Sequence, residues 1–243
     1  MREQTTKAYS TMNGGGLMTI STNLTIFGGT GDLTFRKLLP ALYTMDITGK
    51  LPEDSRITII GRRDYDSSHY RQIARDWVEK FTRLSFEEKA FDRFSEKIDY
   101  YRMDFSRLEA YHGLNHYYRE NDISSHIFYF AVAPRFFSAI TEGLKLVHGS
   151  SSGKVILEKP FGENLAAATA LNTELEAFFG PEHIYRIDHY LGKEMVRNIQ
   201  AIRFSNPFLQ TCGIPAILNL CRFPPWRTWA WKPAAVTMMP AAP

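Results

Sequence analysis

The chain has 243 residues, of which 44% are hydrophobic and 23% are charged, and its formal net charge is +3. This composition is typical of a globular protein with one large domain, or one domain and part of a second, and the small charge without a block of Lys or Arg argues against nucleic-acid binding. With two cysteines and no apolar run of about 18 residues, the sequence excludes a disulfide framework and a membrane-spanning helix, and we expect a cytoplasmic protein.

The N-terminal segment 1–22 is polar and glycine-rich and lacks the continuous apolar stretch of a signal peptide. We expect it to be a flexible leader, and Met18 could be the natural start.

Short apolar runs alternate with amphipathic stretches from Asn23 onward. The expected strands cover Leu24–Phe27, Arg56–Ile60, Asp99–Met103, His126–Val132, Lys154–Glu158 and His183–Ile187. The expected helices cover Leu38–Ile47, Tyr70–Phe81, Leu108–Glu120, a segment after Pro134, and Asn164–Phe179. This alternation predicts an α/β domain with a doubly wound (Rossmann-like) parallel sheet, which we place at residues 23–204.

A glycine-rich stretch, GGTGDLTFRK, joins the first strand to its helix, where such a sheet places its phosphate-binding turn. Gly28 can take the tight turn, and Gly31 lets a pyrophosphate approach the backbone at the helix start. Leu33 stands where a full GxGxxG motif has its third glycine. The glycines alone therefore leave two interpretations open, a nucleotide site and a turn without a ligand.

The second strand ends in Gly61-Arg62-Arg63, where a site for NAD usually carries an acidic residue. An arginine there can bind the 2′-phosphate of NADP, so the pattern favours NADP. The alternative is a pair of solvated arginines.

Two further segments carry polar side chains at strand ends. Lys159 follows the fifth strand and precedes Pro160, which keeps its backbone extended. The sixth strand leads into RIDHYLGKE, where His189, Tyr190 and Lys193 could grip a phosphomonoester and Asp188 could orient an imidazole. Alone, this segment could equally be a polar strand end with a helix cap.

Taken together, GGTGDLTFRKLLPALY, IIGRR, EKPFG and above all RIDHYLGKE resemble the glucose-6-phosphate dehydrogenase family, over roughly Leu24 to Gln210. The resemblance implies a dinucleotide-binding domain followed by a larger, mostly antiparallel α+β domain. It also implies oxidation of D-glucose 6-phosphate to 6-phosphoglucono-1,5-lactone with reduction of NADP, without a metal, in the oxidative pentose phosphate pathway.

The resemblance also assigns roles to residues of this chain. The cofactor turn would comprise Gly28, Gly31, Asp32 and Leu33, and Arg62 would meet the 2′-phosphate. Lys159 would touch both substrate and cofactor. The sugar phosphate would be held by His189, Tyr190 and Lys193, and Asp188 would support the catalytic base.

The base is a histidine of the family's second domain, and this sequence has no counterpart for it. The family forms homo-oligomers, and we expect this chain to lack the domain that would form their interface. From these absences we expect a truncated chain that is inactive alone, the alternative function being a non-catalytic NADP-binding domain or interaction fragment.

The C-terminal stretch differs in texture from the rest. The residues after Gln210 hold six of the twelve prolines and three of the four tryptophans, without Asp or Glu. Plausible codons for Thr211 onward, read in a shifted frame, can give a sequence typical of the family's continuation. We therefore expect a frameshift just before Cys212, in nature or in sequencing, and an irregular, non-native tail over 205–243.

Overall fold

The computed structural model describes residues 22–162, 164–187 and 198. Apart from Thr22, the expected leader (1–22) and the whole expected tail (205–243) lie outside these residues. Six strands are described: β1 (Thr22–Phe27), β2 (Arg56–Gly61), β3 (Ile98–Arg102), β4 (Ser125–Phe130), β5 (Lys154–Glu158) and β6 (Ile184–Ile187). The α-helices are α1 (Leu39–Ile47), α2 (Ser67–Phe81), α3 (Glu88–Glu96), α4 (Ala110–Glu120), α5 (Phe137–Leu144) and α6 (Leu165–Phe179). A π-helical stretch, η1 (Thr34–Leu38), precedes α1, and short 3₁₀ turns occur at η2 (Pro134–Phe136), η3 (Ser150–Ser152) and η4 (Pro181–His183).

The strands form one parallel sheet in the order β3-β2-β1-β4-β5-β6. Phe27, the last residue of β1, is in register with Ile60 of β2 and with Phe130 of β4. The chain runs outward from β1 to β3 and then returns to the other side of β1, so the order of strands reverses between β1 and β4. The predicted doubly wound α/β sheet is confirmed, and its topological switch point lies at the carboxyl ends of these two strands.

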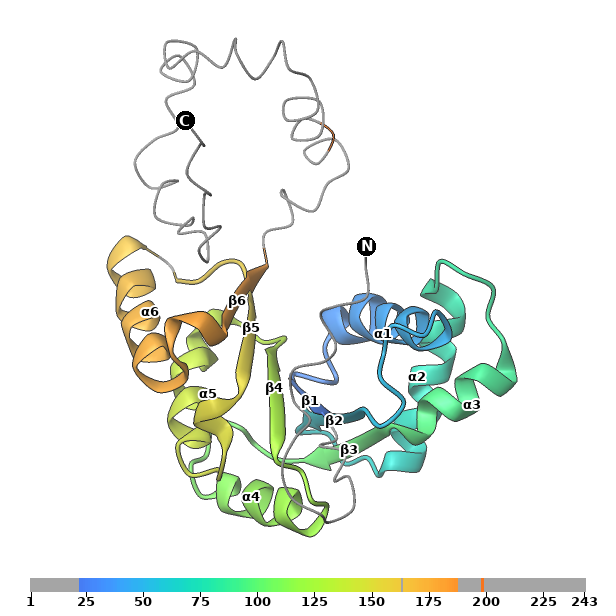
Figure 1. The fold of residues 1–243 in the computed structure, drawn as a ribbon, viewed down its shortest axis with the longest axis horizontal. Helices are drawn as coiled ribbons and strands as arrows, with labels where there is room; N and C mark the ends of the chain where they lie inside the picture. The colour runs from blue at the N-terminus through green and yellow to red at the C-terminus, as the bar shows by residue number, and fades with distance from the viewer. Residues whose placement is uncertain (1–21, 163, 188–197, 199–243) are drawn as a thin grey trace, which may run out of the picture.

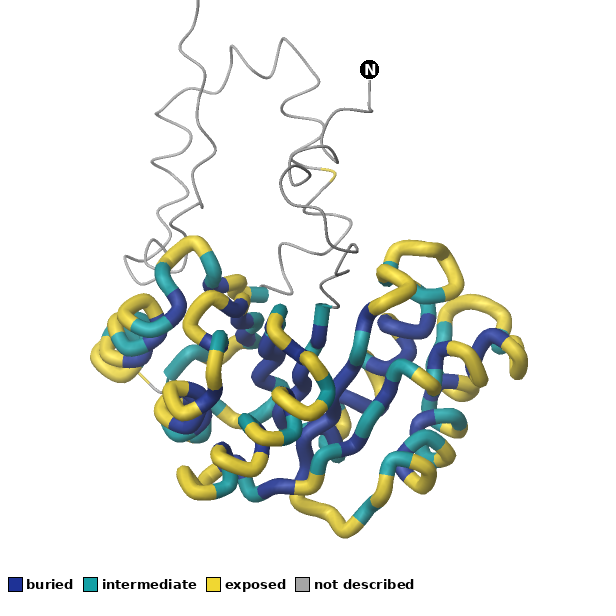
Figure 2. Tube along the Cα trace, turned by 60° about the horizontal axis from the view of Figure 1, so that its bottom comes forward, coloured by how far each residue is buried: buried dark blue, intermediate teal, exposed yellow. Residues whose placement is uncertain are grey.

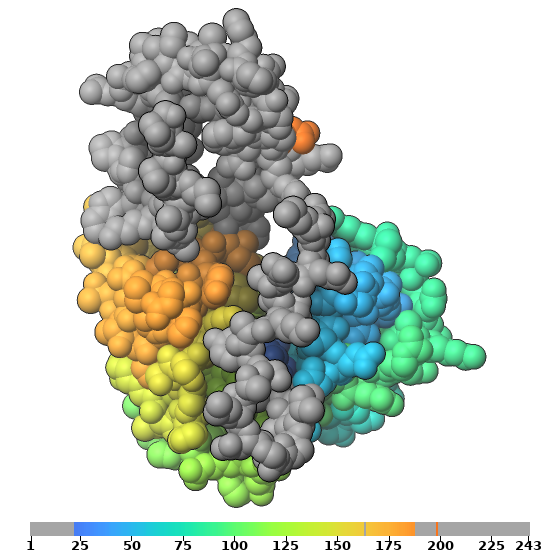
Figure 3. All heavy atoms as spheres, in the orientation of Figure 1, coloured from blue at the N-terminus to red at the C-terminus, as the bar shows by residue number. Residues whose placement is uncertain are grey.

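Helices cover both faces of the sheet, with α1, α2 and α3 on one face and α4, α5 and α6 on the other (Figure 1). Alternate strand residues serve the two faces: Ile26 packs in the cluster with α1–α3, whereas Phe27 packs in the cluster with α4–α6. The two helical layers form the two sides of the domain in the space-filling view (Figure 3), and the strands between them are mostly buried (Figure 2). Burial on both faces explains why the inner strands β2 and β4 contain long apolar runs, whereas the edge strands β3 and β6 are partly exposed.

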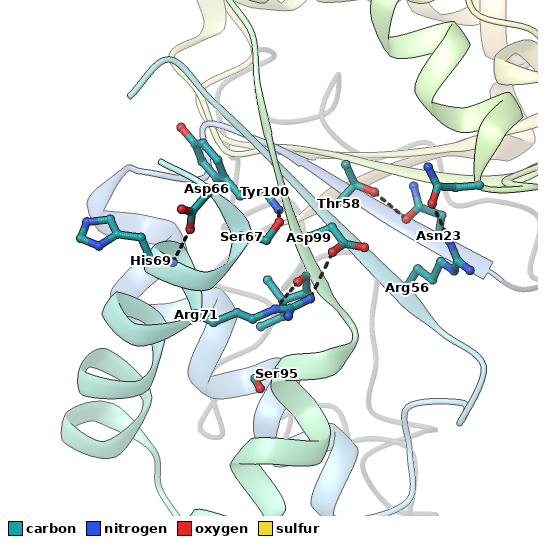
Figure 4. A network of polar contacts seen from close by, with 12 residues as sticks. Asn23, Arg56, Thr58, Asp66, Ser67, His69, Arg71, Ser95, Asp99 and Tyr100 are labelled. Carbon is teal, nitrogen blue, oxygen red and sulfur yellow. Dashed lines mark hydrogen bonds and ion pairs between the residues drawn. The ribbon is translucent and has the colours of Figure 1, made fainter. Parts of the chain in front are cut away.

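A small network of buried polar side chains connects β1 to the neighbouring strand β2 and to helix α4. Thr58 donates a hydrogen bond to the side-chain oxygen of Asn23 at 2.9 Å (Figure 4), and the Asn23 amide donates to Thr25 at 2.9 Å. The hydroxyl groups of Thr25 and Tyr118 lie 2.6 Å apart, which extends the group to α4. Because buried polar atoms are costly unless paired, these bonds favour one register of β1 against β2.

The first helical segment begins earlier than the expected Leu38. Residues Asp32 and Leu33 are already helical, and the π-helical stretch η1 follows. Pro40 has no backbone N–H to donate, and the Leu39 amide donates to the Thr34 carbonyl five residues back. The π-helical stretch therefore lies directly before α1, in whose first turn Pro40 stands.

A second difference is α3 (Glu88–Glu96), which the sequence analysis did not predict. Its buried residues Ala90, Phe91 and Phe94 follow a helical spacing. The boundaries of the other elements differ from the expected ones by a few residues. None of the helices in the described part of the chain is long and apolar enough to cross a membrane.

Candidate functional site

The turn after β1 is built from glycines that meet neighbouring strands closely. Gly28 has a φ of +90°, which residues with a side chain rarely adopt. A Cβ atom there would lie 2.4 Å from the Ala131 carbonyl oxygen and 2.7 Å from Cγ1 of Val132. Gly28 therefore supplies the tight turn predicted for it, directly beside the end of β4 at the switch point.

Gly29 meets β2 in the same way, although the sequence analysis did not single it out. Its amide donates to the Ile60 carbonyl at 2.8 Å, and a Cβ atom would lie 2.0 Å from Cγ2 of Ile59. The Gly-Gly doublet was the available signal. The reason for the second glycine lies in β2, thirty residues further along the chain.

Gly31 closes the turn and starts the helix. Its amide donates to the Gly28 carbonyl at 3.0 Å, and Phe35 donates the first helical hydrogen bond to the Gly31 carbonyl at 3.2 Å. The amides of Asp32, Leu33 and Thr34 precede that bond, so they belong to the helix start, whose N–H groups need partners outside the helix. Such a helix start at a switch point can bind a phosphate group.

The side chains around the turn have different surroundings. The buried Thr34 hydroxyl donates to the Gly28 carbonyl at 3.1 Å and so fixes the turn from inside. Asp32 is exposed and forms an ion pair with Arg36 at 3.5 Å, and Leu33 packs partly buried against the cluster of α1–α3. Leu33 occupies the third-glycine position as a packing residue.

Arg62 directly follows β2 and is exposed. It lies near Asp104, in the loop after β3. Hydrogen bonds from Ser106 hold the pKa of Asp104 below its usual range, and the charges of Arg62 and Arg107 contribute further in the same direction. Arg62 thus follows a strand at the carboxyl edge of the sheet, and this strand, β2, is the neighbour of β1, which leads into the glycine turn.

Lys159 follows β5 at the same edge, and the Lys159–Pro160 peptide bond is cis. The preceding residue, Glu158, accepts a hydrogen bond from the Tyr129 hydroxyl at 2.5 Å. Tyr129 is buried in β4, and burial together with this bond raises the pKa of its hydroxyl far above the usual range. Tyr129 therefore remains a donor that ties the end of β5 to β4.

The structure thus brings together one part of the predicted site. Gly28, Gly31, Asp32, Leu33, Arg62 and Lys159 all follow the carboxyl ends of strands β1, β2 and β5. The other predicted residues, Asp188, His189, Tyr190 and Lys193, lie outside the described residues. β6 leads up to them and ends at Ile187, in register with Glu158. Within the described ranges, no three His, Cys, Asp or Glu side chains are grouped as a metal site.

Comparisons with known proteins agree with this arrangement. A family model described as "Glucose-6-phosphate dehydrogenase, NAD binding domain" matches residues 25–198. Glucose-6-phosphate 1-dehydrogenase of Gluconobacter oxydans is 41% identical over 192 residues, which are 76% of this chain and 38% of that protein. The enzyme of the same name from Bacillus subtilis is 35% identical, over 77% of this chain and 39% of its own length.

Solved structures show the same likeness. The crystal structure of glucose-6-phosphate 1-dehydrogenase from Mycobacterium avium superposes with a TM-score of 0.68 at 30% identity, covering 79% of this chain and 41% of that one. A glucose-6-phosphate dehydrogenase "in complex with its substrate glucose-6-phosphate" gives a TM-score of 0.66 at 31% identity, with the same coverage. The chain therefore spans about two fifths of the length of the relatives it matches.

Proposed function

Since the chain belongs to the glucose-6-phosphate dehydrogenase family, we propose that residues 23–204 form a domain that binds NADP. The observation that carries this proposal is the turn at Gly28–Gly31. Its glycines leave no room for a side chain beside β4 and β2, and it ends at a helix start on the switch point of the sheet. This cradle fits a pyrophosphate, because backbone amides and the positive end of the helix dipole meet at one place.

The choice of NADP over NAD rests on Arg62. Its exposed guanidinium follows the strand next to β1, at the position that faces the ribose of the adenosine in doubly wound folds. A guanidinium can pair with the 2′-phosphate of NADP through two hydrogen bonds, whereas NAD has no phosphate group at this position.

The reaction we propose for the whole protein is oxidation of D-glucose 6-phosphate to 6-phosphoglucono-1,5-lactone. When bound, NADP would accept the hydride from C1 of the sugar. Lys159 would contact both ligands, and His189, Tyr190 and Lys193 would hold the sugar phosphate, with Asp188 supporting a histidine base. The edge position of Lys159, beside the switch point, supports its part in this arrangement.

A titration calorimetry experiment on the 243-residue chain tests the cofactor assignment. We expect saturable binding of NADP⁺, with weaker binding of NAD⁺. Arg62→Ala should weaken NADP⁺ binding by about 10- to 100-fold, the value of a charge-assisted hydrogen bond, and leave NAD⁺ binding unchanged. Arg93→Ala, which removes an exposed arginine of α3, serves as the matched control and should change neither.

Two results would contradict the proposal. A chain that is folded by circular dichroism but does not bind NADP⁺ would refute the cofactor domain. An equal loss of NADP⁺ and NAD⁺ binding in Arg62→Ala would refute only the role of Arg62 in selecting NADP. The second candidate, a non-catalytic NADP-binding domain, rests on a cofactor turn that is complete in the described residues. Saturable binding without turnover fits both candidates, whereas turnover of glucose 6-phosphate would exclude the second.

A further inference from the structure

Two buried tyrosines lie side by side beneath the proposed cofactor site. Tyr70 belongs to α2 and has no exposed surface, and Tyr100 belongs to β3 and is 8% exposed. Their rings stack with centroids 5.0 Å apart and an angle of 19° between the planes. Phe35, from the first helical segment, also stacks on Tyr70 at 5.6 Å. The pair is therefore fixed by aromatic packing between the helices and the sheet.

Each hydroxyl group of this pair donates to a backbone carbonyl in a different loop. The Tyr70 hydroxyl donates to Gly29 at 2.6 Å, inside the glycine turn. The Tyr100 hydroxyl donates to Arg63 at 2.9 Å, in the loop that carries Arg62. One stacked pair thus connects the loop proposed to bind the pyrophosphate with the loop proposed to bind the 2′-phosphate.

Gly61 provides the space that the second contact needs. A Cβ atom on Gly61 would lie 2.6 Å from the Tyr100 hydroxyl oxygen and 3.0 Å from Cγ2 of Thr30, a residue of the glycine turn. A larger residue at the end of β2 would therefore displace the hydroxyl from the Arg63 carbonyl. Gly61 thus allows the two loops and the Tyr100 side chain to meet at one point.

Tyr100 is also held through its backbone. Its amide donates to the Ser67 hydroxyl at 2.9 Å, at the first turn of α2 (Figure 4). The same turn is capped by Asp66, which accepts from the His69 amide at 2.7 Å. Burial raises the pKa of both tyrosine hydroxyls, so both remain protonated donors at neutral pH.

We propose that Tyr70 and Tyr100 are positioning residues with separate tasks: Tyr70 holds the glycine turn for the pyrophosphate, and Tyr100 holds the Arg62–Arg63 loop for the 2′-phosphate. This inference rests on the proposed binding of NADP. Neither tyrosine needs to touch the cofactor, because each acts through the backbone carbonyl that it binds.

The two tasks predict different ligand responses, which a general structural role would not produce. Tyr70→Phe should weaken the binding of NADP⁺ and of NAD⁺ alike, by about 3- to 10-fold, because both nucleotides contain the pyrophosphate. Tyr100→Phe should weaken NADP⁺ by a similar factor and change NAD⁺ binding by less than about twofold. Both are measured by titration calorimetry on the 243-residue chain.

Tyr43→Phe is the matched control. Tyr43 is fully buried in the same cluster, and its hydroxyl accepts from the Glu87 amide at 3.0 Å, outside both loops. It should lose stability in urea like the other two variants and bind both nucleotides like the wild type. An unchanged NADP⁺/NAD⁺ ratio in Tyr100→Phe, or wild-type binding in Tyr70→Phe, would overturn the inference.

Hydrogen exchange of the nucleotide-free protein tests the positioning independently of binding. Tyr70→Phe should speed exchange in peptides covering residues 28–34, and Tyr100→Phe in peptides covering 61–66, each without affecting the other loop. If the wild type did not bind NADP⁺, the proposed function would fail, yet loop-specific exchange would still support the positioning. Exchange that is unchanged in both variants, or that rises equally across the domain, would refute it.

Discussion

The buried residue His126 should make the stability of the domain fall as the pH is lowered. The residue lies in β4, and its side chain is 3% exposed. Its ring stacks on Phe128 with centroids 5.4 Å apart and packs against Tyr118 at 4.9 Å. Neither ring nitrogen has a hydrogen bond of ordinary geometry within the described part of the chain, although the backbone of His148 lies close enough to oppose part of the pKa shift. Burial in these surroundings lowers the pKa of His126 from 6.5 to about 4.

The direction of this pH effect follows from the protonation of His126 in the folded and in the unfolded chain. Well above pH 6.5 the ring is neutral in the folded and the unfolded chain, so His126 makes almost no pH-dependent contribution there. As the pH falls from 6.5 toward 4, the unfolded chain takes up a proton that the folded chain refuses, and stability is lost. A shift from 6.5 to about 4 corresponds to about 3 kcal/mol in full, of which about 2 kcal/mol is lost between pH 7 and pH 5.

The comparison of His126→Phe with the wild type isolates this contribution. Urea unfolding, followed by circular dichroism at pH 7, 6 and 5, should give a free energy that falls less steeply with pH in the variant, by about 2 kcal/mol over this range. His112→Gln, which changes an exposed histidine of α4, should follow the wild-type slope. Equal slopes for wild type and His126→Phe would refute the reasoning, whatever their difference at pH 7.

Three further predictions concern the proposed site and the sequence beyond it. Gly31→Ala should change the free energy of unfolding by less than about 1 kcal/mol, because its Cβ atom would meet only the Gly28 carbonyl oxygen, at 3.2 Å. In calorimetry the same variant should bind NADP⁺ at least roughly tenfold more weakly, because the methyl group would stand where the proposed pyrophosphate approaches. A polypeptide of these 243 residues should not reduce NADP⁺ with glucose 6-phosphate above background, because we expect the histidine base that Asp188 would support to lie in the family's second domain; NADPH absorbance measures this, and enzyme-like turnover would contradict it. The DNA around codon 211 should contain a frameshift, and a single intact frame that codes the present tail would refute this origin of residues 212–243.

Much of the fold could be predicted because its strands are buried on both faces. The strand Lys154–Glu158 has an apolar run at 155–157 between two charged residues, and the structure places β5 at these residues. The helix α3 was not predicted, although Phe91 and Phe94 have helical spacing, because its nine residues carry few apolar positions among many charges. A short helix of this kind is specified mainly by the core that covers it, which a local pattern does not contain.

A residue of the candidate site could be predicted from the sequence only where the reason for it lies in the same short segment of the chain. Gly28 has a positive φ in a strand-to-helix turn, and the sequence shows such a turn directly. Gly29 is required by Ile59, and the Gly29 carbonyl is bound by Tyr70, 41 positions away. These partners are distant in the sequence, so no motif in GGTG could reveal them. The residues that follow different strands could be grouped from the sequence because parallel strands bring their carboxyl ends to one edge of the sheet.

The amides of Gly28, Gly29 and Gly31 all donate to carbonyl groups of the protein, so the proposed anion would meet the amides of the helix start at residues 32–34. The Gly28 carbonyl accepts from Thr34 and Gly31, and the Gly29 carbonyl accepts from Tyr70, so these two oxygens of the turn are bound from the protein side. Carbonyl oxygens held in this way cannot rotate toward a phosphate and repel it. The helix start that follows has amides that require partners outside the helix, and its dipole favours a negative charge. The proposed pyrophosphate site therefore depends as much on how the turn's oxygens are held as on the absence of side chains.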